Sequence, residues 1–179
     1  MSGIAVPRQL EPRFLQRLRL HAGDSKVKAL NELLFTIVSE TLITANLAEI
    51  PGAEGVPAAV RSVIRDHAKD EARHHVFYRN VLFDLWSNID KEQQETAGEM
   101  IPRLIMSFME PDRPAIIQEM ELVGIARAQA GEIFAEACSD TKVSECARAS
   151  ASMMIEYVKQ LGALEIPRVF DEFSRLRLL

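Results

Sequence analysis

The chain has 179 residues, of which 47% are hydrophobic and 26% are charged, a balance typical of one globular domain. Its formal net charge of -5 leaves no basic surface for a nucleic-acid backbone, so we expect no nucleic-acid partner. The most apolar stretch, residues 33–50, contains two glutamates, and residues 1–13 lack a signal-peptide core. We therefore expect no membrane segment and a cytoplasmic location.

Helical periodicity dominates the sequence, and segments rich in proline and glycine interrupt it. We expect residues 1–25 to form a short helix or an arm that lies on the rest. The pattern predicts helices over residues 27–49, 57–88, 91–109, 113–138 and 142–164. Asp112 is placed to cap the fourth of these helices, and runs of strict alternation that would indicate strands do not occur. The sequence therefore predicts an all-α protein in which residues 26–179 form a single helical-bundle domain.

The second predicted helix carries His67, Glu71 and His74, which are four and three residues apart. This spacing places the three side chains on one helix face. The same face continues in both directions with less polar residues, namely Val60, Ile64, Tyr78, Val81 and Leu85. We therefore expect the two imidazoles and the carboxylate to point into the protein, where an unpaired charge needs a metal ion or another partner.

The first predicted helix has a single ionisable residue, Glu40, within the apolar run 33–48. An antiparallel hairpin of the first two helices would place Glu40 at the depth of His67 and His74, because each helical residue rises by about 1.5 Å. Two imidazoles and two carboxylates form a ligand set suited to iron, with manganese as a second candidate metal. The competing interpretation is a set of hydrogen-bonded core residues without a metal.

Glu40, followed by "HAKDEARHH" from 67 to 75, resembles the C-terminal metal-ligand motif of the p-aminobenzoate N-oxygenase (AurF-like) family. The resemblance implies a ferritin-like helical fold and a non-haem diiron centre. It also implies that dioxygen is used to oxidise an amine in natural-product biosynthesis. By the same resemblance Glu40, His67, Glu71 and His74 would be iron ligands, and Glu71 would be placed to bridge two irons.

The family also takes a glutamate and a second Glu-x-x-His from helices upstream of this motif, whereas this sequence has no other Asp- or Glu-x-x-His. His21 has no neighbouring carboxylate pattern and is expected to be a surface residue or a helix cap, and His75 is expected beside the ligands or exposed. Glu121 and Glu156 are the later acids that could replace the missing ligands, with Glu121 the stronger candidate. Both are more typical of helix edges.

Three interpretations of the motif remain open. In the first, the chain is an oxygen-activating oxidoreductase that supplies half of a dimetal site, and a second copy or a separate polypeptide supplies the other half. Its substrates would be a small-molecule amine and dioxygen. In the second, the four ligands hold a single metal ion. In the third, the chain is a non-catalytic subunit or shortened paralogue whose motif serves stability or assembly. A partial bundle would expose a hydrophobic face in each case, which favours oligomerisation, most simply as a homodimer.

Overall fold

The structure is a computed structural model that describes residues 28–49 and 55–179. These residues form helices joined by short turns, and none of them lies in a strand. The elements in chain order are α2 (Lys28–Glu49), α3 (Ala58–Asn88), α4 (Lys91–Met109), α5 (Arg113–Leu122), α6 (Arg127–Ala137), α7 (Asp140–Ser150), α8 (Ser152–Gln160), η3 (Ala163–Glu165) and α9 (Pro167–Arg175). The predicted all-α helical bundle is confirmed.

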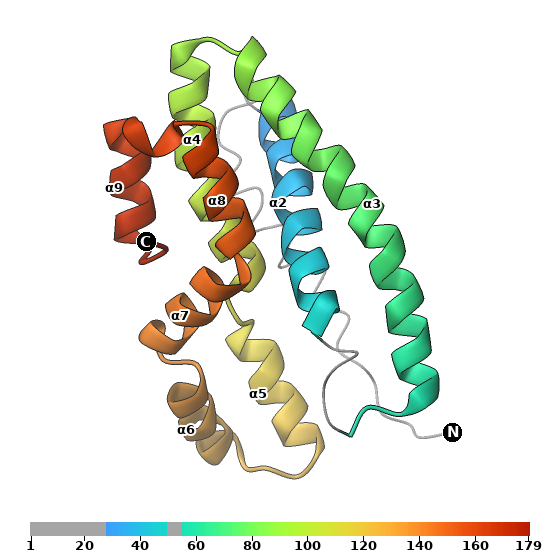
Figure 1. Cartoon of the computed structure of the whole chain (residues 1–179). Coiled ribbons are helices and arrows are strands. Elements are labelled where there is room, and N and C mark those ends of the chain that lie inside the picture. The colour runs from blue at the N-terminus through green and yellow to red at the C-terminus, as the bar shows by residue number, and fades with distance from the viewer. Residues whose placement is uncertain (1–27, 50–54) are drawn as a thin grey trace.

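Helix α2 lies at the centre of the bundle, with α3 along one side and α4 along another (Figure 1). Its apolar face supplies much of the core, since four of its hydrophobic side chains are at most 1% exposed: Leu34, Ile37, Val38 and Leu42. Full burial of each such side chain contributes about 1.5–3 kcal/mol. This packing fixes α2 in the bundle and therefore fixes where Glu40 stands relative to α3.

The first three predicted helices are confirmed, whereas the predicted helix over residues 113–138 is wrong, because the chain forms α5 and α6 instead. The chain turns at Gly124, whose φ of +91° lies in the left-handed region that glycine favours. Asp112 caps α5 as predicted, since its carboxylate accepts a hydrogen bond from the Ala115 backbone N–H at 3.2 Å.

The predicted helix over residues 142–164 is also divided. Helix α7 ends at Ser150, α8 ends at Gln160, and Gly162, with a φ of +69°, introduces the short turn η3. Helix α9 is not predicted by the periodicity, since Pro167 reads as a break between elements. Proline is nevertheless favoured at the first position of a helix, which is the position Pro167 occupies.

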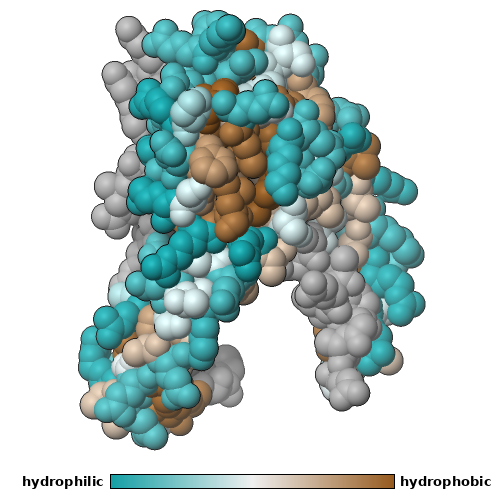
Figure 2. All heavy atoms as spheres, turned by 60° about the vertical axis from the view of Figure 1, so that its left-hand side comes forward, coloured by the Kyte–Doolittle hydropathy of each residue, from teal (hydrophilic) through white to brown (hydrophobic). Residues whose placement is uncertain are grey.

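Helices α5 and α6 form a lobe of their own at one end of the molecule (Figure 1). They pack around a small cluster of Ile117, Ala130 and Phe134, separate from the main core. Figure 2 shows the lobe projecting from the main body of the molecule.

The helices described above do not test the expected N-terminal arm or the expected single domain. The predicted arm or short helix at residues 1–25 lies outside the described residues. That residues 26–179 form one domain stays a prediction. Among the helices that the structure describes, none is long and apolar enough to cross a membrane.

Candidate metal centre

The α2–α3 hairpin brings Glu40 against Glu71 and His74. One ligand atom from each of these three residues lies within 4.8 Å of the other two. His74 Nδ1 lies 3.6 Å from Glu40 Oε2 and 3.4 Å from Glu71 Oε2. The Thr44 hydroxyl, one turn after Glu40, also donates a hydrogen bond to the backbone carbonyl of Glu71 at 3.3 Å. The two helices therefore meet at the depth that their sequences predict.

His67 stands at the edge of this group. Its Nε2 lies 3.5 Å from Glu71 Oε1, whereas His74 approaches Glu71 Oε2. The convergent group within 4.8 Å contains Glu40, Glu71 and His74, without His67. Glu71 thus faces one histidine with each of its carboxylate oxygens.

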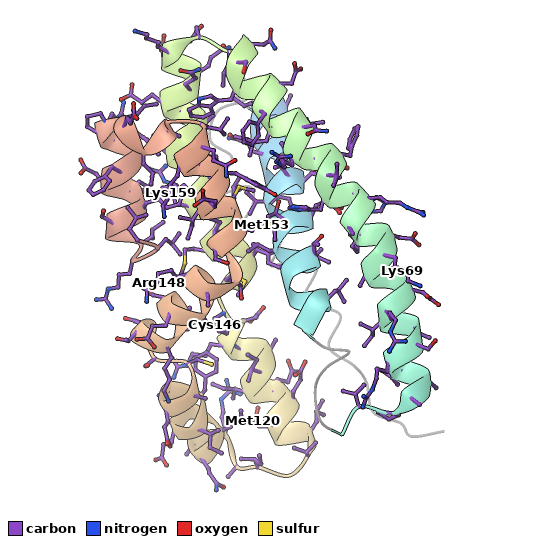
Figure 3. The ribbon with its side chains drawn as sticks, in the orientation of Figure 1. Lys69, Met120, Cys146, Arg148, Met153 and Lys159 are labelled. Atoms are coloured by element: carbon purple, nitrogen blue, oxygen red, sulfur yellow. The ribbon has the colours of Figure 1, made fainter. Side chains whose placement is uncertain are left out.

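The charged residues between these side chains on α3 point elsewhere, as their spacing predicts. Lys69 extends away from the hairpin (Figure 3) and pairs with Asp66 at 3.1 Å. Arg73 pairs with Asp70 at 3.3 Å in the same exposed part of the helix. These ion pairs form a solvated flank beside the candidate centre.

The four candidate ligands differ in burial. The Glu71 and Glu40 side chains are 10% and 23% exposed, whereas those of His67 and His74 are each 56% exposed. The prediction that both imidazoles point into the protein is therefore wrong for this chain alone. The physical reason is that the side of α3 on which they lie faces solvent, as the 45% exposure of Val60 also shows.

The electrostatics of the group favour a cation. Burial raises the pKa of Glu40, and a hydrogen bond between the two carboxyls and the negative charge of Glu71 raise it further, while His74 opposes this change. Glu40 Oε2 is buried and has no hydrogen-bond partner among the described residues. A divalent cation between Glu40, Glu71 and His74 would supply that partner and relieve the repulsion between the carboxylates. The residues present therefore fit a metal ion.

His75 has a different role from His74. Its Nε2 lies 2.7 Å from the Tyr157 hydroxyl on α8, and the two rings stack with their centroids 5.7 Å apart. Burial lowers the pKa of His75, and the positive charge of Arg79 lowers it further. His75 therefore joins α3 to α8 instead of joining the carboxylates.

The later acids do not complete the group. Glu121 lies on α5 and pairs with Arg127 at 3.3 Å. Glu156 is exposed on α8 and accepts a hydrogen bond from Gln160 at 3.2 Å. Both behave as helix-edge carboxylates, and His21 lies outside the described residues.

Tyr78 packs against the main core, and two residues near the centre have roles that the sequence patterns do not assign. Thr44 lies one turn after Glu40 on the same face, so helical spacing is a signal that could have found it. Tyr157 is 82 residues from His75 along the chain, so no local spacing indicates their contact.

Comparison with known proteins places these residues in a family. The sequence model of the family described as p-aminobenzoate N-oxygenase AurF matches residues 2–162. The chain belongs to this family. The match to the AurF family extends well beyond the motif-bearing residues 27–88 and reaches through α8. AurF-family proteins are diiron enzymes of the N-oxygenase type with a ferritin-like bundle, so the fold class and the resemblance predicted from the motif are both confirmed.

A search of curated proteins and a search of solved structures each found no match.

Proposed function

We propose that this chain is part of a non-haem iron oxygenase that uses dioxygen to oxidise the nitrogen of a small-molecule amine. Two findings support the proposal: membership of the AurF family, and the convergence of Glu40, Glu71 and His74 within 4.8 Å. The convergence carries most weight, because it joins two helices through the residue types that iron prefers. The amine substrate and a place in natural-product biosynthesis come from the family.

Glu40, Glu71 and His74 would hold the metal, with His67 approaching the second oxygen of Glu71. Iron suits this mixture of imidazole and carboxylate, and manganese is the second candidate. When bound, iron supplies the one-electron and oxygen chemistry that no side chain provides. Each carboxylate oxygen of Glu71 faces a different histidine, so this carboxylate would be available to more than one metal ion.

The chain's own residues prepare the site in two ways. The raised pKa of Glu40 means that its carboxyl retains a proton more readily before metal binding, and ligation would release that proton. The hydrogen bond from the Thr44 hydroxyl to the Glu71 backbone keeps α2 and α3 in register. Together these features hold the two carboxyl groups close without requiring both to be ionised.

The test begins with anaerobic loading of the metal-free protein with ferrous iron and measurement of iron per chain. Dioxygen is then added, its uptake is followed by stopped-flow absorbance, and p-aminobenzoate is used as a probe amine for mass spectrometry. Glu71→Gln should weaken iron binding by about tenfold or more and abolish dioxygen uptake. The matched control is Asp84→Asn, an exposed acid further along α3.

Each step of this test can contradict a different part of the proposal. A fully loaded protein that does not consume dioxygen would contradict the oxygenase assignment and support a non-catalytic subunit. Dioxygen uptake without an oxidised amine would leave an oxygen-activating protein with another substrate.

A mononuclear centre is the second candidate, because three of the four predicted ligands converge and His67 stands apart. The family centre holds two metals, so its other half would come from a second copy or from a separate polypeptide. Iron content separates these alternatives: one iron per monomer supports the mononuclear centre, and two per assembled site support the dimetal centre.

A further inference from the structure

The side of α3 that carries His67 and His74 also carries exposed hydrophobic side chains. Val63 lies about one turn before His67 and is 70% exposed, and Phe77 lies one turn after His74 and is 61% exposed. Val60, at 45% exposure, continues the strip. Valine, phenylalanine and metal-ligand histidines gathered on one solvent-facing strip are typical of a surface that another protein covers.

We propose that a second copy of the chain docks on this strip, with its α3 antiparallel to the first, and that the two copies form one dimetal site across a two-fold axis. This inference rests on the proposed function, since it concerns the same site. Dimetal carboxylate bundles take one glutamate from each of two helices and a Glu-x-x-His from each of two others. Glu40 on α2 and Glu71 with His74 on α3 are one half of that set, and a second copy supplies the same half again.

The order of residues along α3 suits pairing with itself. A two-fold axis that passes between Asp70 and Glu71 places His67 opposite His74 of the partner subunit, because position i then meets position j and j meets i. The same axis brings Val63 close to Phe77 of the partner subunit, one residue out of exact register, and both side chains are exposed. Ligands therefore meet ligands, and hydrophobic side chains meet hydrophobic side chains.

The charges beside the strip agree with the same antiparallel arrangement. Asp66 and Arg73 are exposed on one flank of α3, where each has a partner within its own helix. An axis between Asp70 and Glu71 leaves Asp66 and the partner's Arg73 two residues, or about 3 Å, out of exact register on the same flank, a distance that the long arginine side chain can span. Asp70 meets its own copy beside the axis, where the Arg73 of each copy pairs with it. Such complementary charges set the orientation of a complex more than its affinity.

The test measures mass in solution by light scattering, together with iron content, at micromolar concentration. The wild-type chain should be a dimer, and Val63→Glu should halve its mass and remove the paired iron. Because Val63 is 70% exposed, the variant should retain the helical circular dichroism of the wild type. The matched control is Val76→Glu, since Val76 is 54% exposed on the opposite side of the same helix and should leave mass and iron content unchanged.

Three outcomes would overturn the inference. A wild-type monomer that binds iron, with either one or two ions, needs no second copy. A dimer that Val63→Glu does not dissociate uses another surface. A monomer that gains iron only when a different polypeptide is added identifies a separate chain as the partner.

These outcomes are distinct from failure of the proposed function. A dimer that uses this strip and holds iron but consumes no dioxygen would keep the inference and remove the oxygenase assignment. A monomer that consumes dioxygen would remove the inference of a shared site and keep the oxygenase assignment.

Discussion

Glu71 is the one candidate ligand that lies close to both His67 and His74. Its side chain is 10% exposed, and its two oxygens lie 3.5 Å from His67 Nε2 and 3.4 Å from His74 Nδ1. Side chains at i-4 and i+3 flank a residue on the same helix face, so this arrangement follows directly from the His-x-x-x-Glu-x-x-His spacing. Glu40 is added by the neighbouring helix, and its position depends on core packing.

The first prediction separates the two adjacent histidines. His74→Ala should strongly reduce iron content, because His74 is one of the three convergent residues. His75→Ala should leave iron content unchanged and lower the free energy of unfolding by about 1 kcal/mol, since it removes the hydrogen bond to Tyr157. Metal analysis and chemical denaturation measure the two effects. Loss of iron in the His75 variant and retention in the His74 variant would show that the wrong face of α3 has been assigned.

The second prediction concerns Glu172, whose carboxylate binds Arg175 at 2.7 Å and Arg103 on α4 at 2.6 Å. Hydrogen bonds from Arg175 lower the pKa of Glu172 from 4.5 to about 2, with a further contribution from Arg103, while burial opposes the change. Because the folded-state pKa is depressed, the stabilisation is complete above the unfolded value and is lost as the pH falls from 4.5 toward about 2.

Glu172→Gln should therefore lower the free energy of unfolding at pH 7 by roughly 2 kcal/mol. Near pH 2 the difference from the wild type should be much smaller. Urea denaturation at both pH values measures it, and Glu156→Gln, which changes an exposed helix-edge acid, is the control. An equal loss at both pH values would show that the ion pair is not responsible.

At the scale of elements, α4 and α9 approach closely at Gly98. A β-carbon built at Gly98 would lie 2.5 Å from Val169 Cγ2 and 3.5 Å from the Trp86 ring. Both neighbours are buried, so neither can move away freely. Glycine is therefore needed here for close packing and not for its backbone conformation.

The third prediction follows from that contact. Gly98→Ala should lower the free energy of unfolding by about 1–3 kcal/mol, since overpacking outweighs the better helix propensity of alanine. Gly131→Ala is the matched control, because Gly131 is also within a helix but its β-carbon would have no neighbour within 4 Å. That variant should gain up to about 1 kcal/mol. Thermal unfolding of the two variants gives the comparison, and equal stabilisation of both would contradict the close approach.

The sequence predicts some elements and misses others for identifiable reasons. Helices α2, α3 and α4 begin and end where the periodicity places them, because prolines or polar turns separate them. The break at Gly124 is missed because the apolar pattern continues through it, while the left-handed φ depends on the tertiary fold.

The candidate centre is also predicted in part from the sequence. Helical spacing places His67, Glu71 and His74 on one face, and the hairpin places Glu40 beside them. The exposure of the two imidazoles is not predictable from α3 alone, because it depends on what covers that helix in space. The contact between His75 and Tyr157 joins distant segments and leaves no local pattern.

For the whole molecule, the candidate centre has a cost in the absence of metal. The carboxylates of Glu40 and Glu71 repel each other whenever both are ionised, and Glu40 Oε2 has no hydrogen-bond partner among the described residues. Residues arranged for binding therefore reduce the stability of the unbound fold.

The fourth prediction is that ferrous iron raises the thermal midpoint of the wild-type protein, because a ligand that binds only the folded state stabilises it. At a free concentration of about 100 times Kd the gain is about 2.7 kcal/mol. Glu40→Gln should unfold at an equal or higher temperature than the wild type without iron, and it should lose the response to iron. Differential scanning calorimetry under nitrogen measures both effects. A metal-free Glu40→Gln variant that is much less stable would show that the carboxylate serves the fold.

The separate lobe of α5 and α6 has a consequence for how the protein opens in solution. Its core consists of three buried side chains, Ile117, Ala130 and Phe134, whereas the main core draws on most of the other helices. So small a cluster opens at a low free-energy cost, and its amides exchange through this local opening while the rest of the bundle remains folded. Hydrogen–deuterium exchange should therefore label residues 113–137 well before α2 and α4, and brief trypsin treatment should cut near Arg127 before it cuts within α2 or α4. The α2–α3 hairpin should survive that cleavage, together with any metal bound to it.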